Sequence, residues 1–166
     1  MNPSAWISQH ARTLTPGSAI DIAAGSGRHA FLLAGLGFQV TSVDVNPAVS
    51  AIYLETSIAF KNLDLEGSQW PLSGQQFDLV VVSNYLYRPH FPSLIQLVAP
   101  DGHLLYETFG LGNERYGKPS NPNFLLKEYE LASLLGSEFV VLDEKFEEVS
   151  EPTPAVRAGI FARRLK

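Results

Sequence analysis

Two acidic residues stand on either side of a short glycine-rich stretch, and together they could bind a small molecule. Asp21 lies a few residues before Gly25-Ser26-Gly27, and Asp44 comes at the end of the next apolar run. Glycines in a tight turn allow the backbone to approach a ligand closely. A carboxylate that follows such a turn accepts hydrogen bonds from ribose hydroxyls, so the spacing is typical of a nucleoside site.

The acid before the turn indicates which nucleoside. Residues 25–30, Gly-Ser-Gly-Arg-His-Ala, match the dinucleotide pattern G-x-G-x-x-A, in which a pyrophosphate fills the turn. The Asp21 carboxylate would point into that space and repel the pyrophosphate by several kcal/mol. S-adenosylmethionine has no phosphate and carries a sulfonium and an ammonium group. The acid therefore favours S-adenosylmethionine over a dinucleotide.

The elements around the turn form a strand-helix-strand unit. Residues 18–24 are apolar and are bounded by turn residues, which predicts a strand buried on both faces. Apolar residues at helical spacing predict a helix over 28–35, and a second strand follows over 38–45. Ligands of open α/β sheets bind at the carboxyl ends of parallel strands, so this unit would hold both acids at one crevice.

These motifs resemble those of class I S-adenosylmethionine-dependent methyltransferases. Residues 21–27 are similar to the first family motif, D-x-G-x-G-x-G, with Ala23 where the first glycine is usual. Residues 44–45 resemble the second motif, residues 62–65 the third, and residues 77–84 the fourth strand with its exit loop. The resemblance implies these cofactor-binding residues: Asp21, Ala23, Gly25, Gly27, Arg28, Asp44, Val45, Asp64, Leu65, Ser83, Asn84 and Tyr85.

The remaining sequence predicts further strands and helices around one long loop. Residues 110–124 are rich in glycine, proline and polar residues, and we expect no regular element there. This loop would act as a lid whose polar residues, Asn113 to Tyr116, contact the acceptor. The other expected elements are an N-terminal helix within 1–15, strands over 57–63, 78–82 and 103–109, helices over 91–99 and 125–135, and final strands over 138–144 and 155–162.

The last two strands define the fold class. Their connection is too short for a helical crossover, so they should pair antiparallel. With the resemblance, this implies an α/β fold: a Rossmann-like three-layer α/β/α sandwich with a mostly parallel seven-stranded sheet. The implied strand order is 3-2-1-4-5-7-6, with the last strand antiparallel. We expect residues 1–166 to form a single methyltransferase domain.

Methyl transfer from a sulfonium requires few catalytic groups. It is an in-line displacement, and the protein has to hold donor and acceptor at attack distance and exclude water. The absence of cysteine and of a G-x-S-x-G motif agrees with this chemistry. The four histidines have no ligand spacing, so no metal is expected. A base is needed only for a protonated acceptor, and Tyr85, Glu107 and Glu114 are the candidates.

Within the class, the chain resembles the small tellurite-resistance methyltransferase branch. Arg28 after the glycine turn and the ending over 155–164 carry this likeness. Arg157 lies where that branch has an oxyanion-binding arginine, and it is a fourth catalytic candidate. The His-Arg pair just upstream in that branch is replaced here by Pro-Thr-Pro over 152–154. The acceptor and the methylated atom therefore stay open.

Composition favours a small-molecule acceptor. A net charge of −5 argues against a nucleic-acid partner, which usually needs clustered Lys and Arg. No apolar run approaches the roughly 20 residues of a membrane span, so we expect a cytoplasmic protein of open oligomeric state. Two alternatives remain. One is a cofactor-binding protein without turnover, with a sensing or partner-binding role, and the other is an NAD-dependent oxidoreductase.

Overall fold

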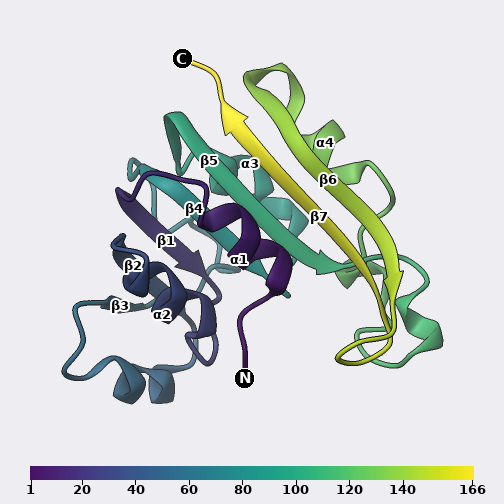
Figure 1. The fold of residues 1–166 in the computed structure, drawn as a ribbon, viewed down its shortest axis with the longest axis horizontal. Coiled ribbons are helices and arrows are strands. Elements are labelled where there is room, and N and C mark those ends of the chain that lie inside the picture. The colour runs from purple at the N-terminus through teal and green to yellow at the C-terminus, as the bar shows by residue number, and fades with distance from the viewer.

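A computed structural model describes residues 1–166, which form one seven-stranded sheet with helices on both faces (Figure 1). The sheet has the order β3-β2-β1-β4-β5-β7-β6, so the predicted strand order is confirmed. The elements are α1 (Ala5–Ala11), β1 (Ser18–Ile22), α2 (Arg28–Gly35), β2 (Gln39–Asp44), β3 (Ala59–Asn62), β4 (Phe77–Ser83), α3 (Phe91–Ile95), β5 (Val98–Phe109), α4 (Glu130–Leu135), β6 (Phe139–Val149) and β7 (Ala155–Arg164). Short 3-10 helices lie at Pro47–Tyr53, Arg88–His90, Asn113–Arg115, Pro122–Phe124 and Gly136–Glu138.

The first five strands are parallel, and their carboxyl ends meet at one edge of the sheet. Ile22 at the end of β1 is in register with Val43 of β2 and with Val82 of β4. At the next strand, Ser83 of β4 is in register with Glu107 of β5. The loops that leave β1, β2, β4 and β5 therefore lie side by side, which is where an open α/β sheet binds its ligand.

The last two strands, β6 and β7, form an antiparallel hairpin beside β5, at the opposite end of the strand order from β3. β7 runs antiparallel to both β5 and β6, as predicted. Arg157, near the start of β7, is in register with Phe109 at the end of β5. The reversed direction of β7 thus brings its first residues to the same edge as the carboxyl ends of the parallel strands.

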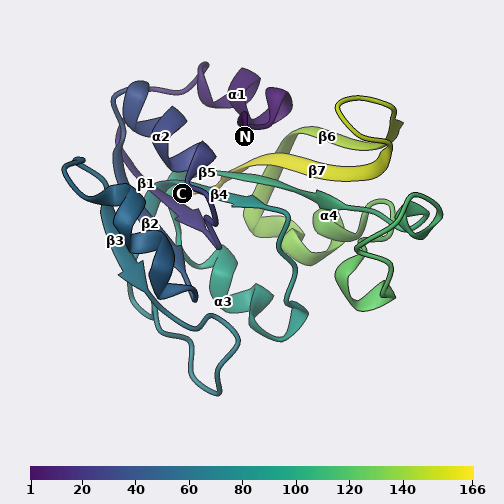
Figure 2. The ribbon, with the colours of Figure 1, turned by 90° about the horizontal axis from the view of Figure 1, so that it is seen from below.

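Successive residues of the central strands pack into two separate cores. Leu79 and Val81 of β4 face the side covered by α1 and α2. Val80 and Val82 face the side covered by α3 and α4. Figure 2 shows these layers, with α1 and α2 on one face of the sheet and α3 and α4 on the other. The predicted three-layer sandwich is confirmed, and burial on both faces explains why the central strands are continuous apolar runs.

Two predicted helices are shorter than the sequence pattern suggested. The helix predicted over 91–99 ends at Ile95, because Val98 already pairs with Phe77 as the first residue of β5. The helix predicted over 125–135 begins only at Glu130. Leu126 instead lies extended, and its N–H donates to the carbonyl oxygen of Phe109. Val98 and Leu126 are thus buried because they pair with strands of the sheet, and not because they lie on the apolar face of a helix.

None of the helices combines the length and the apolar character that crossing a membrane requires.

Candidate functional site

The glycine turn after β1 has an unusual backbone conformation. Ala23, Gly25 and Gly27 have positive φ angles of 53°, 53° and 74°. A side chain at Gly27 would place its Cβ 2.7 Å from the hydroxyl oxygen of Tyr53, so this position requires glycine. A Cβ at Gly25 would meet nothing within 4 Å, so this part of the turn faces open space. The turn therefore has the open backbone surface that close approach of a ligand needs.

Asp44 links this turn to the loop that leaves β2. Its Oδ2 accepts a hydrogen bond from the N–H of Gly25 at 2.8 Å, and its Oδ1 accepts one from the N–H of Asn46 at 2.9 Å. The carboxylate is only half-buried. An ionised carboxylate can accept about four hydrogen bonds, so two positions remain for the hydroxyls of a ribose. The predicted ribose-binding acid thus lies beside the glycine turn.

Asp21 lies beneath the turn, which corrects the expectation that its carboxylate points into the ligand space. The residue is 1% exposed, and its Oδ2 accepts a hydrogen bond from the N–H of Ala30 in the first turn of α2 at 3.0 Å. Burial raises the pKa of Asp21 to about 7, although the Ala30 N–H and the charge of Arg28 act in the opposite direction. Asp21 therefore supports the start of α2 and the turn before it.

Arg28 connects three segments at the carboxyl edge of the sheet. Its Nη2 donates to the Ser83 hydroxyl at 3.0 Å, and its Nη1 donates to the carbonyl oxygen of Asn2 at 3.2 Å. Beside it, the N–H of Ser4 donates to Nε2 of His29 at 3.0 Å, and burial lowers the pKa of His29 to about 4. The sequence predicted an N-terminal helix but not these contacts between residues 2–4 and the glycine turn.

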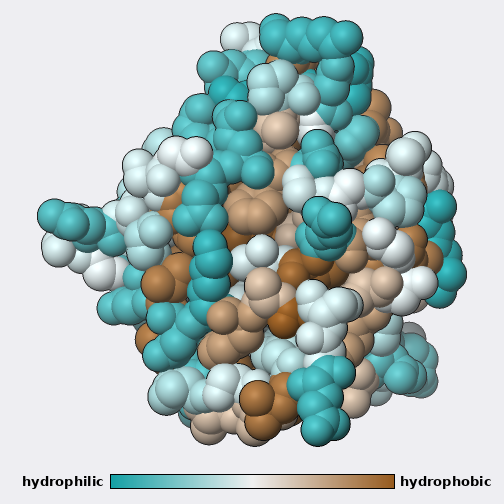
Figure 3. Space-filling model, turned by 90° about the vertical axis from the view of Figure 1, so that its left-hand side faces the viewer, coloured by the Kyte–Doolittle hydropathy of each residue, from teal (hydrophilic) through white to brown (hydrophobic).

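The loops after β2 and β3 form the other end of the predicted nucleoside site. The side-chain amide of Asn62 donates to the carbonyl oxygens of Asp44 and Val45 and so holds the two loops together. Val45 and Asp64 are exposed, whereas Leu65 is buried. Figure 3 views the molecule from the β3 side and shows apolar residues exposed between hydrophilic ones. The predicted binding residues Val45 and Asp64 are therefore accessible to a ligand.

A buried charged cluster lies where β4, β5 and β7 meet. Nη1 of Arg157 donates to Oδ1 of Asn84 at 2.8 Å, and its Nε lies 3.6 Å from Oε1 of Glu107. Nζ of Lys145 is 2.8 Å from the same carboxylate oxygen. Burial alone would raise the pKa of Glu107, but Arg157 and Lys145 lower it below its usual value. Glu107 is therefore an anion, and its Oε2 has no hydrogen-bond partner.

A pocket of about 300 Å³ adjoins this edge on the face of the sheet that carries α3. It contains Asn84 and Tyr85 of the predicted cofactor site, whereas Glu107 and Glu114 do not line it. Burial raises the pKa of Tyr85 far above its usual value, so its hydroxyl keeps its proton at neutral pH. The complete lining is Glu66, Asn84, Tyr85, Leu86, Thr108, Phe109, Pro119 and Phe124.

The segment 110–124 borders this pocket through Pro119 and Phe124, and it is irregular, as predicted, apart from two short 3-10 helices. The first of these 3-10 helices begins at Asn113, which is 2% exposed. The amide of Asn113 donates to the carbonyl oxygen of Pro119 at 3.0 Å, and its Oδ1 accepts from the N–H of Val156 at 3.1 Å. Glu114 is exposed and accepts from the N–H of Gly112. Asn113 thus holds the segment in place and is not free to bind an acceptor.

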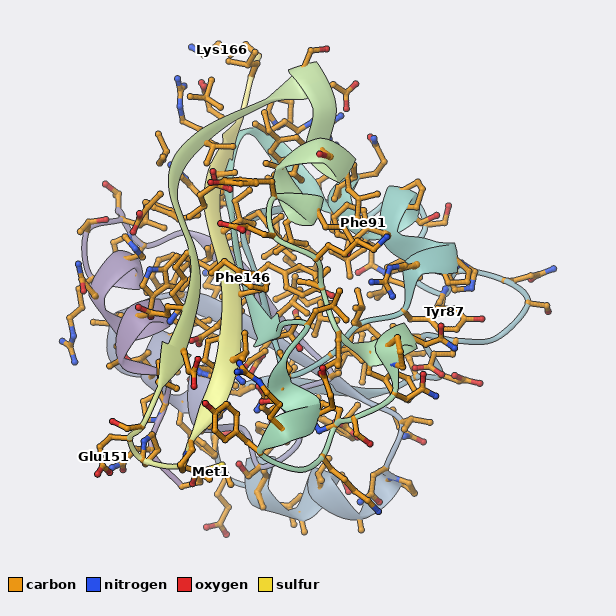
Figure 4. The ribbon with its side chains drawn as sticks, turned by 90° about the vertical axis from the view of Figure 1, so that its right-hand side faces the viewer. Met1, Tyr87, Phe91, Phe146, Glu151 and Lys166 are labelled. Carbon is orange, nitrogen blue, oxygen red and sulfur yellow. The ribbon has the colours of Figure 1, made fainter.

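Arg88 fixes the far end of the same segment. Its Nε and Nη2 donate to the two carboxylate oxygens of Glu130 at 2.6 and 3.0 Å. Its Nη1 and Nη2 also donate to the carbonyl oxygens of Asn123 and Leu125 at 2.8 and 2.9 Å. Tyr87, the neighbour of Arg88, lies beside this part of the chain in Figure 4. The sequence contained no signal for this clamp, because its partners are about 40 residues apart.

The pocket lining includes six residues that the sequence interpretation did not identify as site residues. They are Glu66, Leu86, Thr108, Phe109, Pro119 and Phe124. Thr108 and Phe109 end the predicted fifth strand, so their place at the carboxyl edge could have been inferred from the strand order. Pro119 and Phe124 depend on how the 110–124 segment folds.

Solved structures show the same fold. TehB from Haemophilus influenzae superposes with a TM-score of 0.80 at 20% identity, over 98% of this chain. The present chain spans 62% of the length of TehB. A 1,6-didemethyltoxoflavin-N1-methyltransferase from Burkholderia thailandensis has a TM-score of 0.72 at 22% identity, over 98% of this chain and 78% of that one.

A third structure matches at full length. An S-adenosylmethionine-dependent methyltransferase from Methanosarcina mazei has a TM-score of 0.70 at 19% identity, over 99% of each chain. At these identities the likeness shows the fold alone. A search of curated protein sequences finds no significant match.

The sequence family is shown by a separate comparison. A family profile described as a methyltransferase domain matches residues 3–133, which contain the glycine turn, Asp44 and the residues that leave β4. More than half of the chain is covered by this match. The chain therefore belongs to the methyltransferase domain family.

Proposed function

We propose that the chain transfers a methyl group from S-adenosylmethionine to a small-molecule acceptor. The observation that carries the proposal is the hydrogen bond from the N–H of Gly25 to the Asp44 carboxylate. It lies at the carboxyl ends of the parallel strands, where the loop that leaves the neighbouring strand β4 borders a pocket. An open glycine turn, the carboxylate that we propose binds the ribose and a separate cavity thus lie along one edge of the sheet. The family match supports the same reaction.

The donor half of the site spans the exits of β1, β2 and β3. Asp44 would bind the ribose hydroxyls, Asp64 would receive the adenine amino group, and Val45 would pack on the adenine ring. The open backbone at Gly25 leaves room for the methionine portion. Arg28 lies at this end and carries a positive charge, which suits the methionine carboxylate.

The acceptor half is the pocket beyond Asn84 and Tyr85. When bound, S-adenosylmethionine supplies an activated methyl carbon, to which an acceptor lone pair bonds while the carbon–sulfur electron pair stays on sulfur as neutral S-adenosylhomocysteine. The protein residues orient the two molecules and exclude water. Both halves come from residues 1–166, which supports the proposal that these residues act as one domain.

A relative with two bound molecules supports this division of the site. The Burkholderia thailandensis enzyme was crystallised with 1,6-didemethyltoxoflavin and S-adenosylhomocysteine together. By analogy, we propose that the present chain holds S-adenosylmethionine along the glycine turn and a small organic acceptor in the pocket. The likeness to TehB does not indicate the chemical class of the acceptor, which has to be inferred from the residues that line the pocket.

No residue acts as a nucleophile in this proposal, and a base is needed only for a protonated acceptor. Tyr85 borders the pocket but keeps its proton at neutral pH, so it would not remove a proton from the acceptor. Glu107 is anionic but lies outside the pocket lining, as does Glu114. The proposal therefore favours acceptors that lose their proton to solvent.

Replacement of the ribose-binding acid tests the donor half. We expect Asp44→Ala to weaken S-adenosylmethionine binding by about 1.5–3 kcal/mol, because hydrogen bonds to a charged group are lost. Isothermal titration calorimetry measures the change, and formation of S-adenosylhomocysteine measures turnover. Glu128→Ala, which removes an exposed acid on the segment before α4, is the control for net charge. Equal affinity of the two variants would contradict the site.

A further inference from the structure

We infer that the acceptor is a small, uncharged, planar aromatic ring, and this inference rests on the proposed function. The apolar walls of the pocket indicate the shape of this acceptor. Three aromatic side chains, Tyr85, Phe109 and Phe124, line the pocket from three separate segments of the chain. Leu86 and Pro119 complete the apolar surface. Aromatic rings pack best on other flat apolar rings, so the walls favour a planar ligand over a branched or saturated one.

The charge of the lining excludes an anionic acceptor. Glu66 is the only charged residue of the pocket, and no Lys or Arg lines it. The guanidinium of Arg157 lies 4.5 Å from the centroid of the Phe109 ring but is paired with Asn84 and Glu107. A carboxylate without a cation beside it repels an oxyanion or a carboxylate ligand. A protonated amine has no lone pair with which to attack, which leaves an uncharged acceptor.

Polar groups on one side of the pocket would orient the ring. Because Oδ1 of Asn84 accepts from Arg157, its amide NH₂ remains available as a donor. Thr108 adds a hydroxyl on the neighbouring strand. A ring nitrogen or a ring carbonyl could therefore accept a hydrogen bond at this side while its faces contact the aromatic walls.

The size and rigidity of the pocket limit the acceptor to one or two fused rings. Its volume of about 300 Å³ is at the lower end of the range of ligand pockets. Asn113 holds Pro119, and Arg88 holds the carbonyl oxygens on both sides of Phe124. Three hydrogen bonds thus fix these walls before any ligand binds, and a peptide or nucleic-acid acceptor would not fit without displacing this segment.

A matched set of ligands tests the inference. Quinolin-4-ol, quinoline-4-carboxylate, cyclohexanol and sodium selenite are titrated into the protein saturated with S-adenosylhomocysteine, and binding is measured by ligand-observed NMR and calorimetry. We expect quinolin-4-ol to bind at least tenfold more tightly than each of the other three. We also expect Glu66→Gln to narrow the difference between quinolin-4-ol and its carboxylate counterpart, since that variant removes the only lining charge.

A pair of aromatic variants locates the binding. Phe124→Ala removes a pocket wall that is 48% exposed and should weaken quinolin-4-ol binding at least fivefold. Tyr129→Ala removes a 63% exposed aromatic ring of the following segment that does not line the pocket, and it should leave the affinity unchanged. Thermal unfolding of both variants shows whether each is folded.

The outcomes separate this inference from the proposed function. If the unmodified protein did not bind S-adenosylmethionine, the proposed function would be overturned. Normal S-adenosylmethionine binding, with selenite, cyclohexanol or the carboxylate bound as tightly as quinolin-4-ol, would overturn only the inference. The inference would also be overturned if quinolin-4-ol did not bind at all, or if Phe124→Ala and Tyr129→Ala weakened its binding equally.

Discussion

Individual residues of the first motif carry strain and charge that the folded protein has to accommodate. Ala23 adopts a left-handed backbone conformation with φ of 53°, which costs an L-residue about 1–2 kcal/mol relative to the right-handed one. This explains why glycine is usual at that position of the family motif. The structure retains the conformation because the turn leads directly into α2, whose N–H at Ala30 is bound by Asp21.

Relief of this strain is measurable. We expect Ala23→Gly to raise the free energy of unfolding by up to about 1 kcal/mol, since the relief of left-handed strain exceeds the extra entropy of glycine in the unfolded chain. Urea denaturation measures the change. Ala24→Gly is the matched control, because Ala24 does not have a positive φ angle, and this variant should be destabilised. An increase in the free energy of unfolding of both variants would contradict the explanation by backbone strain at Ala23.

Asp21 and His29 should give opposite pH dependences. Asp21 has a pKa of about 7 in the folded chain against an ordinary 3.8, so the folded state binds the extra proton and stability falls as the pH rises between these values. His29 has a pKa of about 4 against an ordinary 6.5, so the unfolded state binds the extra proton and stability rises with pH over that range. In the unmodified protein the two slopes oppose each other.

Single variants separate the two slopes. In Asp21→Asn the His29 effect is no longer opposed by Asp21, so we expect the free energy of unfolding to increase from pH 4 to pH 6.5 more steeply than in the unmodified protein. In His29→Asn the Asp21 effect is no longer opposed by His29, so the free energy of unfolding should shift downward from pH 4 to pH 7 relative to the profile of the unmodified protein. Urea melts at half-unit pH intervals measure both profiles. Two variants with the profile of the unmodified protein would show that neither group titrates as described.

At the scale of elements, the segment that borders the pocket is held by contacts that no sequence pattern announces. The Arg88 guanidinium ties the 3-10 helix at Pro122–Phe124 to α4. At the start of the same segment, a Cβ at Gly110 would lie 2.6 Å from the ring of Phe146, so the strand β6 packs directly on its backbone. Figure 4 shows Phe146 on the inner side of β6. The segment is thus attached at its two ends and at Asn113.

Removal of the clamp should loosen one end of the segment. We expect Arg88→Ala to increase amide hydrogen exchange in residues 119–130 and to lower the free energy of unfolding by about 1–2 kcal/mol, since the Arg88 side chain is one-third exposed. Hydrogen exchange with mass spectrometry measures the first effect. Arg115→Ala breaks an exposed pair with Glu148 on the other end and should leave residues 119–130 unchanged.

At the scale of the whole molecule, the sequence predicted the sheet better than the pocket. The antiparallel hairpin and the position of Asp44 at the carboxyl end of its strand follow from short-range patterns, because each depends on apolar runs and on the length of a connection. The strand order was implied by the resemblance to class I methyltransferases. The pocket depends on long-range pairing. Leu126 had the pattern of a helix residue but pairs with the end of β5, and Asn113 had the character of a surface residue but is buried.

The shared border at Asn84 has a thermodynamic consequence. Asn84 belongs to the predicted donor site, lines the proposed acceptor pocket and accepts a hydrogen bond from Arg157 of β7. A molecule in either half therefore alters the surroundings of the other. By thermodynamic linkage, the factor by which the acceptor changes the affinity for the methyl donor equals the factor by which the donor changes the affinity for the acceptor. If donor and acceptor bind cooperatively, each should therefore raise the affinity for the other by the same factor, and we expect Asn84 to carry part of this coupling.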